Sequence, residues 1–327
     1  KCPFSYFLKY GLNLKQKEEL KIQNFDTGSF MHEVIDLFFN YVREENIELT
    51  ELLDEEEKIR KIVNQIIETK LDCGKYRFTA TVKYKILMQR LEKMVTKALK
   101  YIVESLVYSD FNVEGTEVEF SKGKEYKPIE IALENGKRIE IIGKIDRVDI
   151  AKTEDGNYLR IIDYKSSDKN VNLTEVYYGL QLQLLVYLDA IIESAMKKGT
   201  SIHPAAILYC KIDNPIAKFS ENKDEEQIDE EILKQSKMKG LLAKDAHIIK
   251  KMDKALYEED VKNSLIVPAG LNKDGSLSKS TNSVTYQEFE ILRKYVKHEI
   301  KDLCEGMLGG DISINPNKHK DRTSCDF

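Results

Sequence analysis

The chain has 327 residues, of which 42% are hydrophobic and 33% charged, and its formal net charge is -5. This length suits one large domain or two ordinary ones. The mildly acidic balance argues against a protein that coats nucleic acid non-specifically, because such binding depends on neutralising phosphates. No apolar run reaches the roughly 18 residues of a membrane span, so we expect no membrane contact. Five scattered cysteines and the lack of a recognisable signal peptide indicate a cytoplasmic location.

The first 110 residues are predicted to be mainly helical. After an aromatic-rich segment at residues 4–11, apolar residues recur at helical spacing from Phe30 to Tyr41. Two longer helices are expected over residues 51–71 and 80–108, because strong helix formers dominate there and the second stretch contains no Gly or Pro.

Residues 111–212 change character and predict a set of strands with one helix. Alternating apolar and polar residues favour strands, and a polar turn at residues 153–157 joins two of them as a hairpin. The expected strands cover residues 113–120, 129–133, 138–142, 143–150, 158–165 and 204–211, and the expected helix covers residues 174–197.

Residues 213–327 are predicted to be helical again, with a polar tail. Residues 214–264 are rich in Lys and Glu and favour partly exposed helices. Thr285 and Glu288 fit a capping box that opens a final helix ending near Leu308. We find no repeat or low-complexity segment, and we expect a single α/β domain over residues 1–327. Its central sheet would be built on residues 111–212, between helical parts at 1–110 and 213–327.

The predicted hairpin brings two acidic side chains together. Asp163 and Lys165 lie two residues apart on one strand, so their side chains leave the same face, whereas Tyr164 points the other way. If residues 153–156 form the loop, Asp146 lies directly across from Asp163, with Cβ atoms about 4.5–5.5 Å apart. A shift of one residue in this register would move a side chain to the other face.

Two carboxylates this close favour a bound cation, because they repel each other unless a cation or a proton lies between them. Mg²⁺ prefers oxygen ligands, typically one or two carboxylates together with water and substrate phosphate. Such an ion can activate water, and a lysine such as Lys165 can orient that water or stabilise the transition state. Asp146, Asp163 and Lys165 therefore predict metal-dependent hydrolysis of a phosphodiester.

A purely structural role is the alternative for each of these residues. Asp163 and Lys165 could form a surface ion pair, and Asp146 could pair with Arg147 or Lys144. The isoleucines that flank both acids favour a functional role, because charges embedded in core strands are usually paired or functional.

Three further polar residues accompany this set. Gln183 and Tyr187 are four residues apart and share one face of the predicted helix. Alternatively, Tyr187 is an aromatic residue of the core, and Gln183 forms a hydrogen bond with a backbone group. His32 lies early in the first long helix, where a lone histidine is more often structural than a ligand.

Taken in order, these residues resemble the motifs of RecB-type nucleases, a branch of the PD-(D/E)XK superfamily. That family has a histidine in an early helix, then Gly-x-Ile-Asp-Arg, Asp-Tyr-Lys and Gln-x-x-x-Tyr. The matching residues are His32, Gly143 to Arg147, Asp163 to Lys165, and Gln183 with Tyr187. Four weak motifs in this order are a specific signal, and the resemblance implies a restriction-endonuclease-like mixed sheet flanked by helices.

The resemblance also implies a metal site. Asp146 and Asp163 would bind Mg²⁺, for which Mn²⁺ could substitute. The carbonyl of Tyr164 would be a further ligand, and His32 a ligand or near-ligand.

It implies catalytic roles as well, on the same basis. Lys165 would position the attacking water and stabilise the transition state. Gln183 and Tyr187 would steady the site or a DNA phosphate.

The two ends of the chain resemble the B subunit of AddAB helicase–nucleases, from Cys2 to Leu12 and from Asn315 to Phe327. In that family one cysteine before the nuclease core and three after it bind a [4Fe–4S] cluster. Cys2 matches the first and Cys325 the second, and the others would lie beyond Phe327. Since each iron needs a cysteine, we expect the cluster in the intact parent protein and an absent or incomplete one here.

The resemblance implies a DNA nuclease of a helicase–nuclease complex that serves double-strand break repair by recombination, with DNA and a helicase–nuclease A subunit as partners. One alternative is a catalytically silent module that binds DNA or a partner subunit. Another is an enzyme acting on a different phosphate ester. Lysine-rich segments at residues 234–254 and 318–322 could follow DNA phosphates or could be solvated surface.

Overall fold

The computed structural model describes residues 2–14, 27–72, 82–213, 233–316, 318–319 and 322–323. Its helical elements are α1 (Pro3–Tyr6), η1 (Phe7–Gly11), α2 (Thr27–Glu44), η3 (Leu49–Leu52), α3 (Glu56–Asp72), α4 (Val82–Val107), α5 (Leu173–Tyr177), α6 (Gln183–Lys197), α8 (Ala246–Met252), η4 (Lys254–Tyr257) and α9 (Tyr286–Leu308). Its strands are β1 (Asn112–Phe120), β2 (Ile129–Ala132), β3 (Arg138–Ile141), β4 (Gly143–Thr153), β5 (Gly156–Lys165), β6 (Ile202–Lys211), β7 (Lys239–Ala243), β8 (Ser283–Val284), β9 (Lys318–His319) and β10 (Arg322–Thr323).

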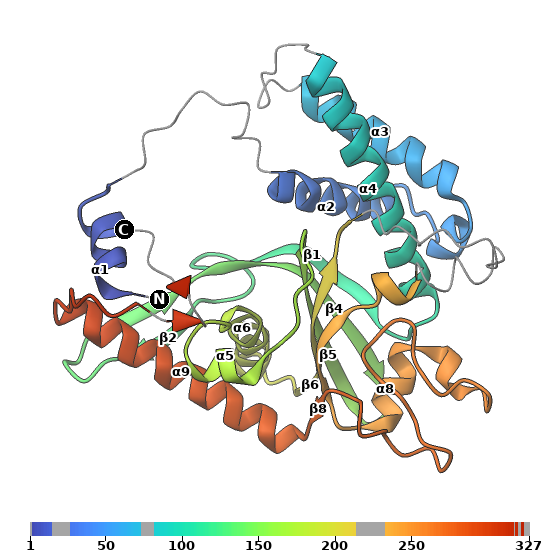
Figure 1. Ribbon diagram of the computed structural model, residues 1–327. Helices are drawn as coiled ribbons and strands as arrows, with labels where there is room; N and C mark the ends of the chain where they lie inside the picture. The colour runs from blue at the N-terminus through green and yellow to red at the C-terminus, as the bar shows by residue number, and fades with distance from the viewer. Residues whose placement is uncertain are drawn as a thin grey trace.

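A six-stranded mixed sheet lies at the centre of the molecule, in the order β1-β4-β5-β6-β7-β8 (Figure 1). The pairs β1–β4, β4–β5 and β6–β7 are antiparallel, whereas β5–β6 and β7–β8 are parallel. A parallel pair needs a crossover connection, and α5 and α6 supply it between β5 and β6.

Helices cover both faces of this sheet (Figure 1). Alternate residues of β5 show the division, because successive side chains of a strand point to opposite faces. Ile162 and Tyr164 pack in one apolar cluster with α2, α3 and α4, whereas Leu159 and Ile161 pack in a second cluster with α6 and α9. The predicted α/β fold, with a mixed sheet between helices and a helical N-terminal part, is confirmed.

The β4–β5 hairpin has the predicted register. Thr153 faces Gly156 and Val148 faces Ile161. Gly156 has a φ of +133°, a conformation that favours glycine and permits the tight turn. The hairpin therefore places Asp146 and Asp163 together at its open end, as expected.

The structure differs from the sequence predictions in the crossover and in the later part of the chain. Residues 174–197 form two helices, because the chain turns at Gly179 with a φ of +68°. Residues 239–243, predicted as helix, form β7, and Leu241, Leu242 and Ala243 complete the buried sheet. The tail contains the short pair β9–β10, and the predicted helix at 51–71 begins only at Glu56. Among the described residues, no helix is both long and apolar enough to cross a membrane.

Candidate active site

Asp146 and Asp163 lie where the β4–β5 hairpin opens. Backbone pairing runs as far as Arg147 opposite Ile162, one step before the two acids. Beyond that pair, the backbone N–H of Tyr164 donates a 2.8 Å hydrogen bond to Oδ2 of Asp146. Asp163 is 1% exposed and Asp146 is 9% exposed. The hairpin therefore holds two buried carboxylates at one end, in the register that the sequence predicts.

Asp163 has a carboxylate that protein groups satisfy only in part. Its Oδ1 is buried and accepts no hydrogen bond from any residue that the structure describes, while Oδ2 forms an ion pair with Lys165. Burial, and then the negative charge of Asp146, raises the pKa of Asp163 to about 6, although Lys165 acts in the opposite direction. A buried carboxylate with an open acceptor atom suits a bound cation, because burial without a partner is costly.

His32 reaches this carboxylate pair from α2. Its Nδ1 lies 3.4 Å from Oδ2 of Asp146, and its ring meets the Tyr164 ring edge-on, with centroids 5.8 Å apart. Burial lowers the pKa of His32, but the hydrogen bond to Asp146 and the nearby negative charges outweigh burial and raise it above its usual value. The imidazole thus faces the acids, as a ligand or near-ligand would.

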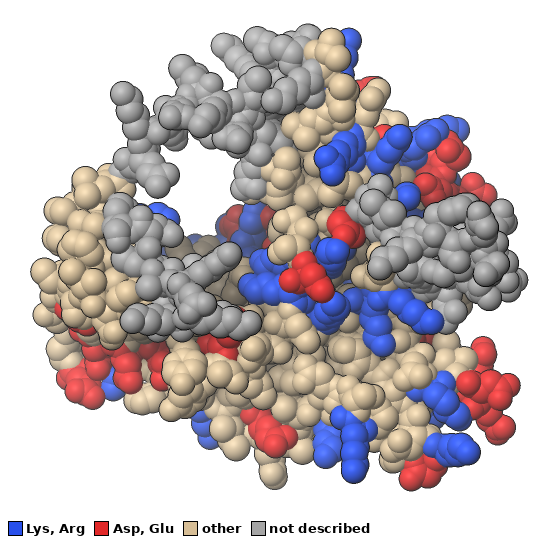
Figure 2. Space-filling view, in the orientation of Figure 1, with Lys and Arg blue, Asp and Glu red and all other residues tan. Residues whose placement is uncertain are grey.

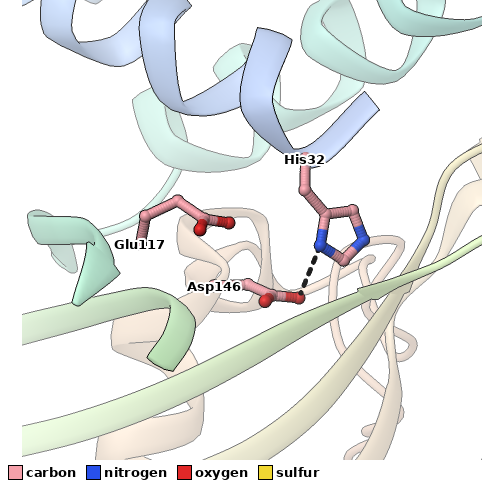
Figure 3. Close-up of side chains that lie close together, drawn as sticks. All are labelled: His32, Glu117 and Asp146. Atoms are coloured by element: carbon pink, nitrogen blue, oxygen red, sulfur yellow. Dashed lines mark ion pairs between the residues drawn. The ribbon is translucent and has the colours of Figure 1, made fainter. Parts of the chain in front are cut away.

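Glu117 is a member of this group that the sequence analysis missed. Ligand atoms of His32, Glu117 and Asp146 all lie within 4.8 Å of one another. Figure 3 shows the three side chains converging, His32 from the helix above and the two carboxylates from neighbouring strands. The set offers a nitrogen and carboxylate oxygens, which suits a divalent cation.

The backbone of β1 explains how Glu117 enters the site. Its neighbours Thr116 and Val118 pair with β4, but Glu117 itself has a φ of +49°, in the left-handed region that residues other than glycine rarely adopt. A register shift also occurs between Val113 and Gly115. Because both irregularities alter which residues share a face, the sequence pattern could not single out Glu117.

Lys165, Gln183 and Tyr187 form a chain of polar contacts beside Asp163. Lys165 Nζ donates to Oε1 of Gln183 at 3.5 Å, and Nε2 of Gln183 donates to the Tyr187 hydroxyl at 2.7 Å. Gln183 is the first residue of α6, so the turn that interrupts the predicted helix sets its position. The structure therefore brings these three residues together, and Gln183 contacts side chains where the structural alternative expected a backbone group.

Gly143 of the Gly-x-Ile-Asp-Arg motif leaves room for an aromatic support. A Cβ atom at this position would lie 2.7 Å from the Phe120 ring, which pairs with Gly143 across β1 and β4. The Phe120 ring in turn meets the Tyr187 ring edge-on, with centroids 6.0 Å apart. A side chain at residue 143 would displace this support of Tyr187.

The opposite face of the hairpin holds a second, closed cluster of charges. Asp149 accepts hydrogen bonds from Arg147 at 3.0 Å and from Arg160 at 3.0 and 2.8 Å. Arg147 also donates to the Tyr164 hydroxyl at 3.2 Å, and all three charged residues are fully buried. Arg147 therefore does not pair with Asp146.

Nor does Lys144, the other alternative partner of Asp146, since it forms an ion pair with Glu117. Both structural alternatives for Asp146 are wrong, and its carboxylate faces His32 and the backbone of Tyr164.

Of the two cysteines predicted to bind a cluster, the structure describes Cys2. Cys2 is buried beside a cavity of about 480 Å³, which is also lined by Tyr178, Leu303 and Met307. The backbone N–H of Phe4 donates to the carbonyl of Ser313 at 3.2 Å, which joins the N-terminal segment to the chain after α9. Cys325 lies outside the described residues, so the cluster stays a prediction.

Comparisons with known proteins point to one family. The sequence profile of the PD-(D/E)XK nuclease superfamily matches residues 1–327. The chain is 49% identical over 328 residues to a protein of Clostridioides difficile (strain 630), and 42% identical over 329 residues to one of Acetivibrio thermocellus. A protein of Thermoanaerobacter sp. (strain X514) is 41% identical. All three are named as the B subunit of an ATP-dependent helicase/deoxyribonuclease.

Each match covers 100% of this chain and 28% of the relative. The chain therefore spans a little over a quarter of the length of these relatives. On the evidence of the matching profile and of these identities, the chain belongs to the PD-(D/E)XK nuclease superfamily.

Proposed function

We propose that this chain hydrolyses phosphodiester bonds of DNA in a reaction that depends on Mg²⁺. One observation carries the proposal: the buried Asp163 carboxylate keeps an unpartnered oxygen next to Asp146, with Lys165 paired to its other oxygen. A silent module would have no need of this arrangement, since a buried acceptor atom without a partner reduces stability.

The residues present fit a divalent cation of this kind. Asp146, Asp163 and the Tyr164 carbonyl would hold it, and His32 and Glu117 lie close enough to Asp146 to contribute ligand atoms. When bound, Mg²⁺ lowers the pKa of a water molecule and stabilises negative charge on a phosphoryl oxygen.

The remaining groups orient the reactants. Lys165 can hold the attacking water through its ammonium group, or donate to a phosphate oxygen as charge develops there. Gln183 fixes the direction of that ammonium group, and Tyr187 fixes the Gln183 amide through its hydroxyl. Because these contacts exist before substrate binds, little reorganisation is needed in the transition state.

We further infer a setting from the names of the relatives and from the resemblance that the motifs and the two ends of the chain carry. The chain would be the nuclease part of a B subunit, with a helicase–nuclease A subunit as partner and DNA repair by recombination as the process, in the cytoplasm. In the intact protein, Cys2 and Cys325 would contribute to a [4Fe–4S] cluster. No catalytic step above depends on that cluster.

The test is cleavage of single-stranded DNA by the chain, with EDTA, Mg²⁺ or Mn²⁺. We expect fragments only with a divalent metal, and none from Asp163→Ala or Lys165→Ala. Asp155→Asn, in the exposed hairpin turn, is the matched control and should cut normally. Undiminished cutting by both site variants would contradict the proposal. Binding without fragments from the unaltered chain under every metal condition would favour the silent module.

A further inference from the structure

Lysines form a row across three strands beside the candidate active site. In the parallel pair β5–β6, Asp163 is opposite Tyr209 and Lys165 is opposite Lys211. In the antiparallel pair β6–β7, Tyr209 is opposite Lys239. Opposed residues share a face of a sheet, so these side chains lie on the face of Asp163. Adjacent strands are about 4.8 Å apart, and the row therefore extends about 10 Å from Lys165.

The Tyr209 ring lies under the ammonium groups of two lysines near this row. Lys165 Nζ lies 5.9 Å and Lys169 Nζ 4.8 Å from the centre of its ring. Tyr209 is 3% exposed, so its ring faces the lysines and not solvent. A ring face attracts an ammonium group, which favours an orientation of both lysines away from the core.

The two outer lysines pair with carboxylates, Lys239 with an exposed one and Lys211 with a half-buried one. Lys239 Nζ lies 2.7 Å from each carboxylate oxygen of Asp168, and Lys211 pairs with Asp213. The Lys239 and Asp168 side chains are 42% and 62% exposed. An exposed pair such as Lys239–Asp168 contributes little stability, so a phosphate oxygen can replace the Asp168 carboxylate at small cost.

A polar groove continues beside the row. It has a volume of about 710 Å³ and is lined by residues 168–175, Gln181 and Asn282. The Asn172 side chain accepts hydrogen bonds from the backbone of Thr174 and Glu175, which orders the wall of the groove. Figure 2 shows Lys and Arg side chains gathered near the middle of the face in view, with acidic side chains among and beside them.

From this placement we propose that Lys211, Lys239 and Lys169 bind the sugar–phosphate backbone of one DNA strand as it leaves the phosphate that is cut at Lys165. The inference rests on the proposed function and adds to it the path of the substrate. A row of about 10 Å can follow one backbone, and the measurements below compare a single strand with duplex DNA.

The test measures binding of a fluorescent 20-nucleotide single strand in EDTA, where no cutting occurs, over a series of salt concentrations. For Lys211→Gln/Lys239→Gln we expect the slope of log affinity against log salt to fall by about 1.4, because each phosphate contact to a single strand contributes about 0.7. The affinity at low salt should fall at least about tenfold. The control Lys61→Gln/Lys152→Gln removes two exposed lysines elsewhere and should match the unaltered chain.

A second measurement separates binding from chemistry. With Mg²⁺, we expect the double variant to have a KM for DNA raised about tenfold and a kcat within twofold of the unaltered chain. An unchanged salt slope, an equal loss in the control, or a loss confined to kcat would overturn the inference. So would a larger change in slope with duplex DNA than with the single strand.

The two proposals can fail separately. If the unaltered chain cuts DNA and the double variant binds normally, only the path is wrong. If the unaltered chain never cuts, the proposed function fails, while the salt slopes still report on the lysine row.

Discussion

β4 and β5 carry two buried groups of charges that are satisfied in different ways. On one face, Asp149 lies between two arginines and the protein itself supplies its partners. On the other, Asp163 keeps an oxygen that no described residue binds, and it lies close enough to Asp146 to feel its charge. Burial alone therefore does not mark a functional charge. The informative feature is a buried carboxylate oxygen that no described residue binds.

Tyr164 connects the two clusters. Its hydroxyl accepts a hydrogen bond from Arg147, and its backbone N–H donates to Asp146. The closed cluster thus helps to fix the strand that carries the open one. We therefore expect opposite effects on stability when the acid of one cluster or the other is neutralised.

The largest effect is expected at Asp163. Asp163→Asn should reduce metal-dependent cutting at least about 10³-fold, since it removes a ligand charge and the partner of Lys165. The same change should raise the midpoint of thermal unfolding in EDTA at neutral pH, because burial and the nearby Asp146 carboxylate disfavour the charged form of Asp163 more than its ion pair with Lys165 favours it. Cleavage assays and thermal unfolding of one preparation check both. A lower unfolding midpoint would show that Asp163 stabilises the fold.

Asp149→Asn should have the reverse profile. It leaves two buried arginines without their counter-charge, and we expect the free energy of unfolding to fall by about 3–5 kcal/mol. Urea denaturation measures this loss, with Asp155→Asn in the exposed turn as the control. A change below about 1 kcal/mol would contradict the description of this cluster as closed and structural.

The pH dependence of stability should separate the clusters further. The pKa of Asp163 is raised from 3.8 to about 6 in the folded chain. The folded chain therefore binds this proton more tightly than the unfolded chain does. The resulting stabilisation is fully present below pH 3.8 and is lost as the pH rises through about 6. In EDTA, the unaltered chain should lose stability relative to Asp163→Asn as the pH rises from 3.8 to about 6, with little further change above that value. Parallel stability curves for the two proteins would contradict this expectation.

The affinity for metal should increase as the pH rises, because the cation binds the deprotonated carboxylate. Mn²⁺ binding, followed by calorimetry, should strengthen across the same pH range. An affinity that does not change with pH would argue that Asp163 is not a ligand.

The smallest effect concerns Glu117. We expect Glu117→Gln to weaken Mn²⁺ binding about tenfold, as for groups that support or complete a metal site. Glu119→Gln is the matched control, since Glu119 lies on the same strand and pairs with Lys124 at the surface. Equal affinities for Glu117→Gln and the unaltered chain would place Glu117 outside the metal site.

The sequence predicted those parts of the site that depend on local pattern. The hairpin register followed from alternation and one turn, and it placed Asp146, Asp163 and Lys165 on one face. Glu117 could not be predicted, because a left-handed residue and a register shift break the alternation of β1. The alternation of apolar and polar residues does not indicate where such irregularities occur.

Helices and strands outside the hairpin were harder to predict where tertiary contacts decide the conformation. The Lys-rich sequence around residues 239–243 predicts a helix. These residues instead pair with the edge of β6 and form β7. Gly240 allows this pairing, since a Cβ atom there would lie 2.1 Å from the Ile207 carbonyl oxygen. The break at Gly179 likewise depends on how the crossover packs against the sheet.

The origin of His32 in α2 has a consequence for the order of folding. Asp146, Asp163, Lys165 and Gln183 come from one contiguous stretch of hairpin and crossover, whose contacts are short in sequence and cheap to close. His32 is more than 100 residues away and reaches the site only when the N-terminal helices dock on the sheet. Full metal affinity should therefore appear late in refolding, after the hairpin has formed. On the proposed function, a refolding chain would reach its full activity only after its helical layer has docked on the sheet.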